Sequence, residues 1–478
     1  MRKSLVRIIC FMSVLISVLY CARKIFSFKY YDGIYGMTKL YELEDNTVDV
    51  LVLGSSHAFA DVDTGVLWDE YGFASFVLGG AIQPIWNTYY YLKEALKTQT
   101  PQLIVLEAYK ITERSDYVND DATIIKNTYG MKWTRNKINA IKVSVPKEKW
   151  GDFLFDYTQY HARYVDLGPE DFLENLGDPL YENWKGSSLF TRTQSLDVSS
   201  INKVTNRIPL NEKVEEYYRK IIELARSNNI PVLVMASPYA AVTEDEMAIY
   251  NSIADIAEEY DVKFINYNLY YNEIGIDYSV DAADDHHLNY KGSSKFTRRL
   301  GADIIQSYDI SDRRGDSKYA SWAANAEYIS SLIKNQLLKE STDLPGIIDN
   351  LKKQEYLLLV SLDGICDISS DNIRIFLGEL GITQDINELY YINNVNGILY
   401  TNELEEETEY FRLDTHDICL SRKMDEASQV FLNNIVIDNV SYTKVKNGIN
   451  VVVYNPKTKT VVDSFGLDMN IGYNLIRL

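Results

Sequence analysis

The 478-residue sequence contains only 4 cysteines, and their positions exclude most cysteine chemistry. Cys10 and Cys21 fall in an apolar N-terminal run, and no cysteines have the spacing typical of a zinc site. Cys366 and Cys419 remain, and they could form a single disulfide or be two buried thiols, since Cys packs readily in cores. The cysteines therefore indicate no cellular compartment.

Positive charge is also scarce, because 48 Lys and Arg residues face 68 Asp and Glu residues and leave a net charge of -20. No nucleic-acid partner is expected, since such binding depends on basic side chains that replace phosphate counterions. Internal repeats and low-complexity tracts are absent, and a hydrophobic share of 46% excludes wholesale disorder. At about 150 residues per domain, the length predicts two or three domains.

Long apolar runs are rare too, and the clearest is Ile8–Ala22, which follows a basic head. Such an order is typical of an export signal or an anchor. Bulky Tyr20 stands where cleavage needs a small residue, so we interpret residues 1–24 as an uncleaved transmembrane anchor. Extended back to Leu5, with Arg7 snorkelling, the run approaches the length that a bilayer needs. Basic residues flank both ends and fix no orientation, but the signal-like order favours an extracytoplasmic position for the rest of the chain.

Residues 45–310 alternate between strand-like and helix-like segments. The strand-like segments are short and rich in Val, Ile and Leu, as buried parallel strands should be; they are Val48–Leu53, Ala74–Leu78, Leu103–Leu106, Pro231–Ala236 and Val262–Asn266. The helical periods are Trp86–Lys97, Asn211–Asn228, Thr243–Tyr260 and Asn289–Gln306. The pattern predicts an α/β domain with a doubly wound, mostly parallel sheet in a flavodoxin-like, three-layer arrangement, with active residues at the C-terminal strand ends.

Residues 111–210 interrupt this alternation. They are rich in Tyr, Trp and Asp, lack a clean strand period and are too long for an ordinary loop, which predicts a helical insertion near the mouth of the site. Its aromatic residues could stack on sugar rings or form the insertion's own core; they are Trp133, Trp150, Tyr157, Tyr160, Tyr164 and Trp184.

A polar stretch near residues 310–318 indicates a domain boundary. Residues 311–345 are predicted to be a linker and a helix, and residues 346–478 a mixed α+β domain. Its signals are a strand at Tyr356–Val360, a helix around Ser370–Leu380, and a hairpin that turns through Asn455-Pro456.

The segment Val48–Ala58, VDVLVLGSSHA, runs from an apolar strand directly into a Gly-Ser-Ser turn. In a doubly wound sheet, a serine at this point stands at the mouth of the ligand crevice. Either Ser55 or Ser56 could serve as a nucleophile. Ser56 is the better candidate, because it lies nearer the N-terminus of the following helix and Gly54 permits the tight turn.

Serine needs a base, and Asp284-Asp285-His286-His287-Leu288-Asn289 could supply one. An aspartate three residues before a histidine can hold one ring nitrogen while the other faces the serine, which favours Asp284 and His287. A metal site is disfavoured because no complete ligand set appears elsewhere. A structural role for the histidine pair, capping the helix that begins near Asn289, is a further alternative.

An oxyanion formed on the substrate would need hydrogen-bond donors. The backbone N–H of Ser56 and those of Gly79 and Gly80 are suitable, because glycine lets the backbone approach a substrate closely. Gly79-Gly80 could equally be a plain turn.

These three blocks resemble the SGNH (GDSL-like) hydrolase superfamily. Gly54-Ser55-Ser56, the turn at Gly79, and the segment from Asp284 to Gly292 are similar to its first, second and last motifs. The resemblance is closest to a cell-envelope branch that includes alginate O-acetylation proteins and the D-alanyl transfer protein of teichoic acids. It implies Ser56 as nucleophile, His287 as base and Asp284 as the residue that orients the base.

The sequence departs from the superfamily at the oxyanion asparagine. A Gly-x-Asn-Asp block is expected after the third strand, but this chain reads Leu106-Glu107-Ala108-Tyr109-Lys110. A side-chain amide would then have to come from Gln83 or Asn87, the two candidate substrate-binding residues. His57, beside the nucleophile, has no role that the sequence indicates.

The C-terminal domain is similar to the interleukin-like EMT inducer (ILEI) domain. The similarity lies in Gln354–Ser361, Gly378–Gly381, Gly448–Tyr454 and Val462–Ser464. It implies a β-sandwich-like module that binds or positions carbohydrate; a module for folding or protein contact is the alternative.

Together, these features predict a membrane-anchored, extracytoplasmic serine esterase or O-acyltransferase that acts on acyl groups of a cell-surface polysaccharide, without a metal or other cofactor. Its expected partners are that polymer or its acyl donor, the membrane, and a membrane acyltransferase. The alternative is a catalytically inactive carbohydrate-binding or scaffold protein of the same machinery.

Overall fold

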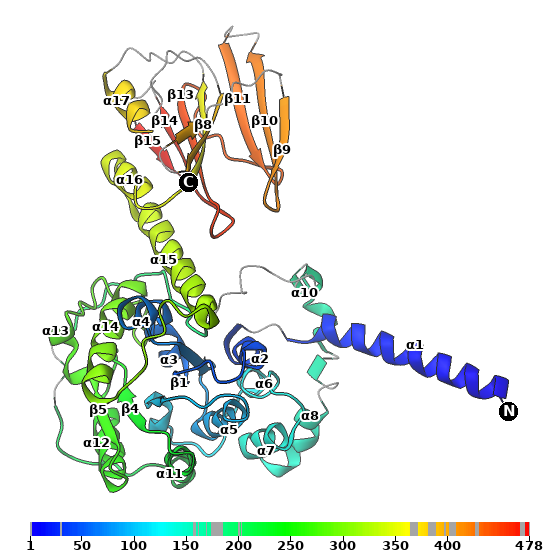
Figure 1. Cartoon of the computed structure of the whole chain (residues 1–478), viewed down its shortest axis with the longest axis vertical. Helices are drawn as coiled ribbons and strands as arrows, with labels where there is room; N and C mark the ends of the chain where they lie inside the picture. The colour runs from blue at the N-terminus through cyan, green and yellow to red at the C-terminus, as the bar shows by residue number, and fades with distance from the viewer. Residues whose placement is uncertain are drawn as a thin grey trace. The chain divides into compact units, whose positions relative to one another are not determined.

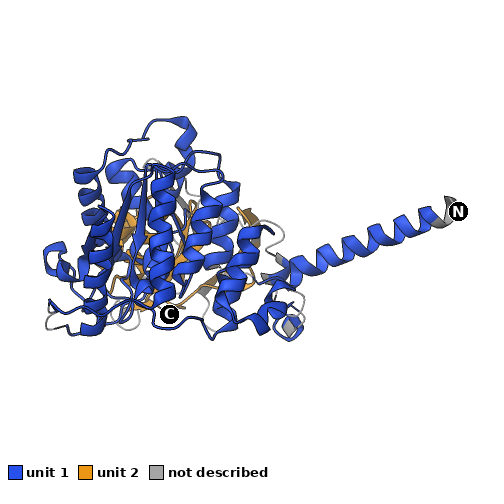
Figure 2. Cartoon of the chain, turned by 90° about the horizontal axis from the view of Figure 1, so that it is seen from below, with its two compact units in different colours: residues 1–326 blue, residues 327–478 orange. Residues whose placement is uncertain are grey.

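The structure is a computed structural model of the chain. It describes residues 2–28, 31–155, 159–160, 162–168, 170–173, 185–198, 201, 203–363, 371–380, 389–395, 398–400, 408–425, 430–468 and 474–477. The chain divides into two compact units, residues 1–326 and 327–478, which Figure 2 colours blue and orange. The connecting helix α15 (Ala320–Glu340) begins in the first unit and ends in the second.

The first unit is built on a parallel sheet, which has five strands among the described residues (Figure 1). Its order is β2-β1-β3-β4-β5, and every neighbouring pair is parallel. The strands are β1 (Val50–Gly54), β2 (Ser75–Gly79), β3 (Leu103–Glu107), β4 (Val232–Ala236) and β5 (Lys263–Asn266). This is the flavodoxin-like strand order, so the predicted α/β fold class is confirmed.

Helices cover both faces of this sheet. Residues such as Leu51 and Leu53 of β1 pack on one helical layer, whereas Val50 and Val52 pack on the other, because successive side chains of a strand point to opposite faces. The first layer includes α5 (Ile85–Ala95), α11 (Glu212–Ser227) and α12 (Glu244–Glu259). The second includes α3 (Ser56–Asp61), α4 (Thr64–Tyr71), α13 (Tyr271–Ile274) and α14 (Tyr290–Ser307). Both faces are therefore buried, which explains the uniformly apolar strands.

Among the described residues of the insertion, helices occur up to Leu173 and not beyond it. Its short helices are η2 (Tyr109–Thr112), α6 (Asp121–Lys126), α7 (Arg135–Ser144), η3 (Lys147–Lys149), α8 (Trp150–Leu154), η4 (Ala162–Val165) and α10 (Glu170–Leu173). The described residues 185–198 are extended instead, with Lys185 O accepting from Val77 N and Phe190 paired with Asn289. The prediction of a helical insertion is therefore wrong for residues 185–198, because this strip satisfies its backbone groups on other segments.

Aromatic residues of the insertion divide between core and surface. Trp150 and Tyr160 belong to a small hydrophobic cluster, whereas Trp133 and Tyr164 are exposed. Tyr157 and Trp184 lie outside the described residues.

The N-terminal helix α1 (Arg2–Phe26) is long and apolar enough between Leu5 and Phe26 to cross a membrane, and this stretch is not buried in the structure. By length and composition alone, such a helix is equally compatible with a signal sequence. Two short elements follow it, η1 (Tyr31–Tyr35) and α2 (Gly36–Glu42).

The second unit contains two antiparallel sheets that pack on each other. One has the order β12-β11-β10-β9 and the other β15-β14-β13-β6-β7-β8 among the described residues. Leu359 and Val452 of the larger sheet meet Ile418 and Ile435 of the smaller one in a shared core. The strands are β6 (Leu357–Asp363), β7 (Leu389–Val395), β8 (Ile398–Tyr400), β9 (Thr408–Leu413), β10 (His416–Asp425), β11 (Val430–Ile437), β12 (Val440–Ser441), β13 (Gly448–Asn455), β14 (Thr460–Asp468) and β15 (Asn474–Arg477).

Helices cover the outer face of the larger sheet, so the predicted α+β composition is confirmed. Leu338 of α15, Ile347 of α16 (Leu344–Leu351) and Phe376 of α17 (Asp371–Glu379) pack with Val451 and Phe465. The predicted hairpin is formed by β13 and β14. Cys419 has a free thiol, and Cys366 lies outside the described residues.

Candidate active site

The Gly-Ser-Ser turn lies at the switch point of the sheet. Strand β1 ends at Gly54, and its two neighbours, β2 and β3, lie on opposite sides of it. Ligands of open α/β sheets bind where the strand order reverses in this way, beyond the carboxyl ends of the strands. Glycine is required at position 54, because a Cβ there would stand 2.7 Å from Cβ of Glu107 on β3. The close packing of β1 and β3 thus leaves room for only a bare backbone before the serines.

Ser56 and the distal loop are joined by a chain of hydrogen bonds. Nε2 of His287 lies 2.8 Å from Oγ of Ser56, and Nδ1 of the same ring lies 2.8 Å from Oδ1 of Asp284. Oδ1 also accepts from the backbone N–H groups of His286 and His287, at 3.0 and 2.9 Å. These bonds fix the carboxylate against the ring, so one histidine nitrogen faces an acid and the other faces a hydroxyl.

The ionisation of the pair suits a proton acceptor near neutral pH. Burial lowers the pKa of His287 below 6.5, against the opposing charge and hydrogen bond of Asp284. Burial raises the pKa of Asp284, but the hydrogen bond from Arg192 and the nearby His287 outweigh this and bring it to about 2. At pH 7, Asp284 is therefore charged and the His287 ring is neutral, as a general base must be.

Arg192 is a site residue that the sequence did not reveal. Its guanidinium pairs with Oδ2 of Asp284, donates to the carbonyl of Ala283 at 3.3 Å, and lies over the Phe190 ring. The extended strip that carries it runs along the histidine loop, with Gln194 N donating to Ala282 O. No local motif predicts such a residue, because Arg192 and its partner Asp284 are 92 positions apart in the sequence.

Ser55 is turned away from His287 and toward the sheet. It is buried, and its Oγ donates to Oε2 of Glu107 at 3.4 Å. Burial raises the pKa of Glu107 to about 8, despite the hydrogen bonds that its carboxyl accepts from Tyr109, Ser55 and Ala108. The bond between Ser55 and Glu107 thus joins the turn after β1 to the end of β3.

The proposed oxyanion and substrate residues differ in their surroundings. Gly79 ends β2 beside Gly54, and a Cβ on Gly80 would stand 2.3 Å from Oδ1 of Asn127, so both positions need a bare backbone. The side chains of Gln83 and Asn87 are buried, and their amide nitrogens donate inside the protein, to Thr88 Oγ1 and Asn127 O.

The remaining residues of the distal loop have separate places. Asp285 is exposed, its carbonyl accepts from Ala241 N, and the His286 ring stacks near Tyr239. The cap of α14 is Asn289, whose side chain accepts from the N–H groups of Lys291 and Gly292. Within the described residues, no group of three or more His, Cys, Asp and Glu side chains could hold a metal ion.

His57 and Asp61 form a buried pair directly behind the candidate site. Nδ1 of His57 lies 3.5 Å from Oδ2 of Asp61, and both side chains are fully buried. The His57 ring stacks on Tyr109, with centroids 4.1 Å apart, and lies 5.1 Å from the His287 ring. Burial lowers the pKa of His57 and raises that of Asp61, so the surroundings favour the uncharged form of each side chain.

Asp61 also links helix α3, which carries Ser56, to the loop that carries His287. Its Oδ1 accepts from the N–H of Leu288 at 3.0 Å, one residue after His287, and its carbonyl accepts from Ser293 Oγ. Because Ser56 and Asp61 are the first and last residues of α3, this short helix holds the nucleophile and the histidine loop at a fixed separation.

We expect Asp61→Ala to lower ester turnover by tenfold or more, since displacement of a catalytic group by about 1 Å costs on the order of 10²-fold. Asp61→Asn should restore most of the rate, because an amide oxygen still accepts from Leu288. Steady-state kinetics with a soluble ester would measure both, and the loss should appear in kcat rather than in KM.

Asp63→Ala is the matched control. This buried aspartate caps α4 through Gly65 and Val66, so its loss should lower stability without moving the histidine loop. If the Asp61 and Asp63 variants lose turnover equally, or if Asp61→Asn is no better than Asp61→Ala, Asp61 does not position His287.

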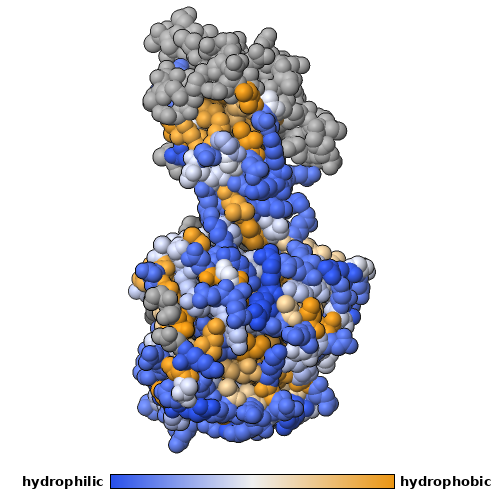
Figure 3. Space-filling view, turned by 90° about the vertical axis from the view of Figure 1, so that its left-hand side faces the viewer, coloured by the Kyte–Doolittle hydropathy of each residue, from blue (hydrophilic) through white to orange (hydrophobic). Residues whose placement is uncertain are grey.

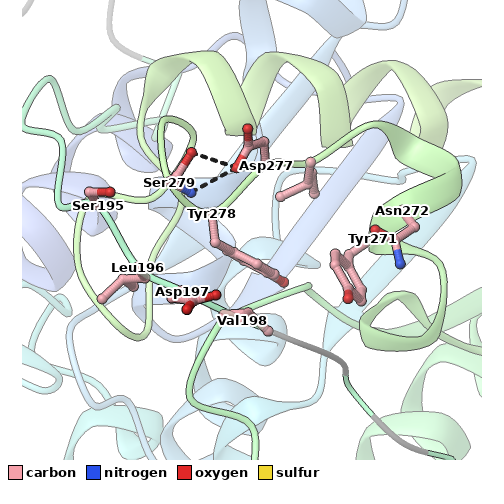
Figure 4. A pocket seen from close by; sticks show the side chains of 10 residues that line it. Ser195, Leu196, Asp197, Val198, Tyr271, Asn272, Asp277, Tyr278 and Ser279 are labelled. Atoms are coloured by element: carbon pink, nitrogen blue, oxygen red, sulfur yellow. Dashed lines mark hydrogen bonds between the residues drawn. The ribbon is translucent and has the colours of Figure 1, made fainter.

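A separate pocket of about 460 Å³ adjoins the strip of residues 185–198 that carries Arg192 (Figure 4). Residues 195–198 line one side of it and residues 276–279 another, and Leu196 N donates to Tyr278 O between them. Figure 4 shows the Tyr278 ring lying between this strip and Tyr271. The lining combines hydroxyl, amide and carboxylate groups with two aromatic rings; its polar members are Ser195, Asp197, Asn272, Asp277 and Ser279.

Comparison with known proteins gives little further information. No family model matches the chain, and no curated protein sequence matches it. Among solved structures, the chain is similar to a candidate acylhydrolase from Bacteroides fragilis, with 11% identity and a TM-score of 0.29 over 59% of this chain and 99% of that one. A similarity of this size is too weak to assign an activity.

Proposed function

We propose that this protein is a membrane-anchored, extracytoplasmic serine esterase or O-acyltransferase with an SGNH-like catalytic domain. The hydrogen-bonded chain Ser56–His287–Asp284 at the switch point of the sheet carries the proposal. It supplies a nucleophile, a base and an orienting acid in the geometry that acyl transfer requires.

In the proposed reaction, Ser56 Oγ attacks the acyl carbonyl carbon while its proton passes to Nε2 of His287. The tetrahedral intermediate collapses to an acyl-enzyme, and the leaving alcohol takes the proton from Nε2. Water or a sugar hydroxyl then attacks the acyl carbon and gives its proton to Nε2 of His287, which returns the proton to Ser56 Oγ as the bond between Oγ and the acyl group breaks. Hydrolysis and transfer share every protein group, and the acceptor alone distinguishes them.

Backbone N–H groups are the proposed oxyanion donors. Ser56 is the first residue of α3, so its N–H has no acceptor within the helix. Gly79 and Gly80 lie at the end of the neighbouring strand and carry no side chain that would hold a substrate away. Since the amide nitrogens of Gln83 and Asn87 donate inside the protein, the backbone is the better source of this stabilisation.

The polymeric substrate is proposed from the surroundings of the site. The pocket beside the Arg192 strip offers hydroxyl, carboxylate and aromatic groups that suit a hydroxyl-rich ligand. Helix α1 would hold the catalytic unit at the cell envelope, and the β-sandwich unit, which we propose to be ILEI-like, would bind or position the polymer. The partners of the whole protein would be the polymer or its acyl donor, and a membrane acyltransferase.

Labelling with a fluorophosphonate probe tests the proposal, because the probe reacts with activated serines. We expect one adduct per chain, mapped by peptide mass spectrometry to Ser56. Ser55→Ala is the matched control and should still be labelled, because Ser55 bonds to Glu107 rather than to His287.

Two outcomes would contradict the proposal that the protein is an enzyme. One is labelling of Ser56→Ala as strong as that of the wild type, and the other is an unlabelled wild-type protein that still binds an envelope polysaccharide. The second result would support a catalytically inactive binding or scaffold protein instead.

A further inference from the structure

The insertion contacts the C-terminal end of α1. Arg163 of η4 donates through Nη1 to the carbonyl of Phe26 at 3.1 Å and to that of Ser27. Its Nη2 pairs with Asp171 of α10 at 2.9 Å, and its guanidinium lies over the Phe28 ring. Figure 1 shows α10 beside this end of α1. One arginine therefore ties two helices of the insertion to the last turn of the apolar helix.

Hydrophobic packing reinforces the same junction. Phe26 and Phe28 pack against a cluster that contains Phe153 of α8 and Tyr160, and the Phe28 and Tyr160 ring centroids are 5.8 Å apart. This cluster is separate from the two cores of the sheet. The insertion thus has its own core, and that core includes the residues at which α1 ends.

Large apolar side chains in this part of the insertion remain exposed. Phe155 is 71% exposed, Tyr164 65%, Val165 68% and Phe172 53%. All four fall within 18 residues of sequence, on or beside α8, η4 and α10. We call these four residues the collar. Exposed apolar side chains that form one patch mark an interaction surface more often than a solvated one.

Geometry limits what can lie against the collar. A 22-residue helix is about 33 Å long, close to the thickness of the hydrocarbon core, so a membrane-crossing α1 would end near one interface. Elements bonded to Phe26 and Ser27 would then lie within a few ångströms of the headgroups. Aromatic side chains are enriched at that depth, where ring bodies meet acyl chains and polar edges meet water.

The side of the first unit that carries α13 and α14 has a different character. Figure 3 shows hydrophobic residues there interspersed among hydrophilic ones. Ile305 of α14 is one exposed apolar residue on this layer, at 56%. A single exposed apolar residue is normal on a soluble surface, so Ile305 by itself indicates no partner.

We propose that the collar is a second membrane contact, which seats the catalytic unit on the lipid interface beside α1. The inference rests on the proposed anchoring by α1 but not on the proposed catalysis. The collar residues are apolar and the neighbouring Asp152, Asp166 and Glu170 are acidic, so binding is by apolar insertion and does not require anionic lipid.

Photocrosslinking of the full chain tests this contact. Benzoylphenylalanine is placed singly at Phe155, Tyr164 and Phe172, and the protein is reconstituted in phosphatidylcholine vesicles. Phe11, in the middle of α1, is the positive control, and Ile305 is the matched negative control of similar exposure. After irradiation, mass spectrometry measures the fraction of chain that carries a lipid adduct.

We expect lipid adducts at the collar positions at least fivefold above those at Ile305, and unchanged when phosphatidylglycerol is added. Adducts at Phe11 with only background adducts at the collar would overturn the proposal while leaving the anchor intact. Background adducts at every position, Phe11 included, would overturn the anchor and the proposal together. Collar adducts to protein instead of lipid in native membranes would assign the surface to a protein partner and also overturn it.

Discussion

Ser56→Ala and His287→Ala are each expected to lower ester turnover by about 10⁴- to 10⁶-fold, because the attacking oxygen is lost in one and its proton acceptor in the other. The 2.8 Å contact between Ser56 Oγ and His287 Nε2 makes the two groups one functional unit. The double variant should therefore be no slower than either single variant. Initial rates with a chromogenic acetyl ester would measure all three.

Ser55→Ala again provides the control. It removes a hydroxyl one residue away, which is buried and faces Glu107, so turnover should stay within a few-fold of the wild type. Thermal unfolding of every variant would exclude loss of folded protein as the cause. If His287→Ala retains wild-type turnover, the contact with Ser56 has no catalytic role.

Asp284→Asn is expected to lower turnover by about 10⁴-fold, the loss seen when the orienting acid of a triad is neutralised. The asparagine can keep an oxygen toward the N–H groups of His286 and His287, but its NH₂ group must then face the guanidinium of Arg192. Two donors then face each other, and the negative charge that favours protonated His287 is gone. Stopped-flow or steady-state rates would measure the loss.

The pH dependence provides an independent test of this role. In the wild type, kcat/KM should rise with pH as His287 loses its proton, with a midpoint below pH 6.5 because burial lowers its pKa. Asp284 raises that pKa, so the midpoint should move to still lower pH in Asp284→Asn. A midpoint that moves upward, or does not move, would mean that Asp284 does not act on His287.

Arg192→Gln separates positioning from charge. It leaves Asp284 ionised but removes the pairing with Oδ2, so we expect a smaller loss than in Asp284→Asn. The two residues share one contact, and the double variant should therefore lose less than the product of the single losses.

Much of the fold was predictable because it depends on local patterns. The five apolar segments became the five parallel strands, and the helical periods became α5, α11, α12 and α14 within a few residues, since buried parallel strands and amphipathic helices have strong periodic signals. The hairpin around Asn455 was predictable for the same reason, because its turn chemistry is local. The extended strip at residues 185–198 was not, because its hydrogen bonds go to distant segments.

The residues of the candidate site also differ in whether local patterns predict them. The serine turn and the Asp-x-x-His loop could be recognised because each is a short motif with chemical meaning. Arg192, Asp61 and Glu107 could not, because each acts on the site through contacts with partners far away in the chain. The bonds to Ser55, Asp284 and Leu288 span between 52 and 227 residues. The surroundings of His57 were likewise not predictable, because its stacking on Tyr109 depends on the tertiary structure.

The sequence by itself determined the order of strands and helices along the chain, the apolar N-terminal run, and the choice of Ser56, His287 and Asp284 as candidates. These depend on the chemistry and periodicity of neighbouring residues. Only the tertiary structure decided that the three side chains are hydrogen-bonded, that Ser55 faces the sheet, and that Arg192 and Asp61 hold the loop. It also brought the exposed collar to the end of α1. Such contacts depend on how distant segments pack together, and no local pattern encodes that.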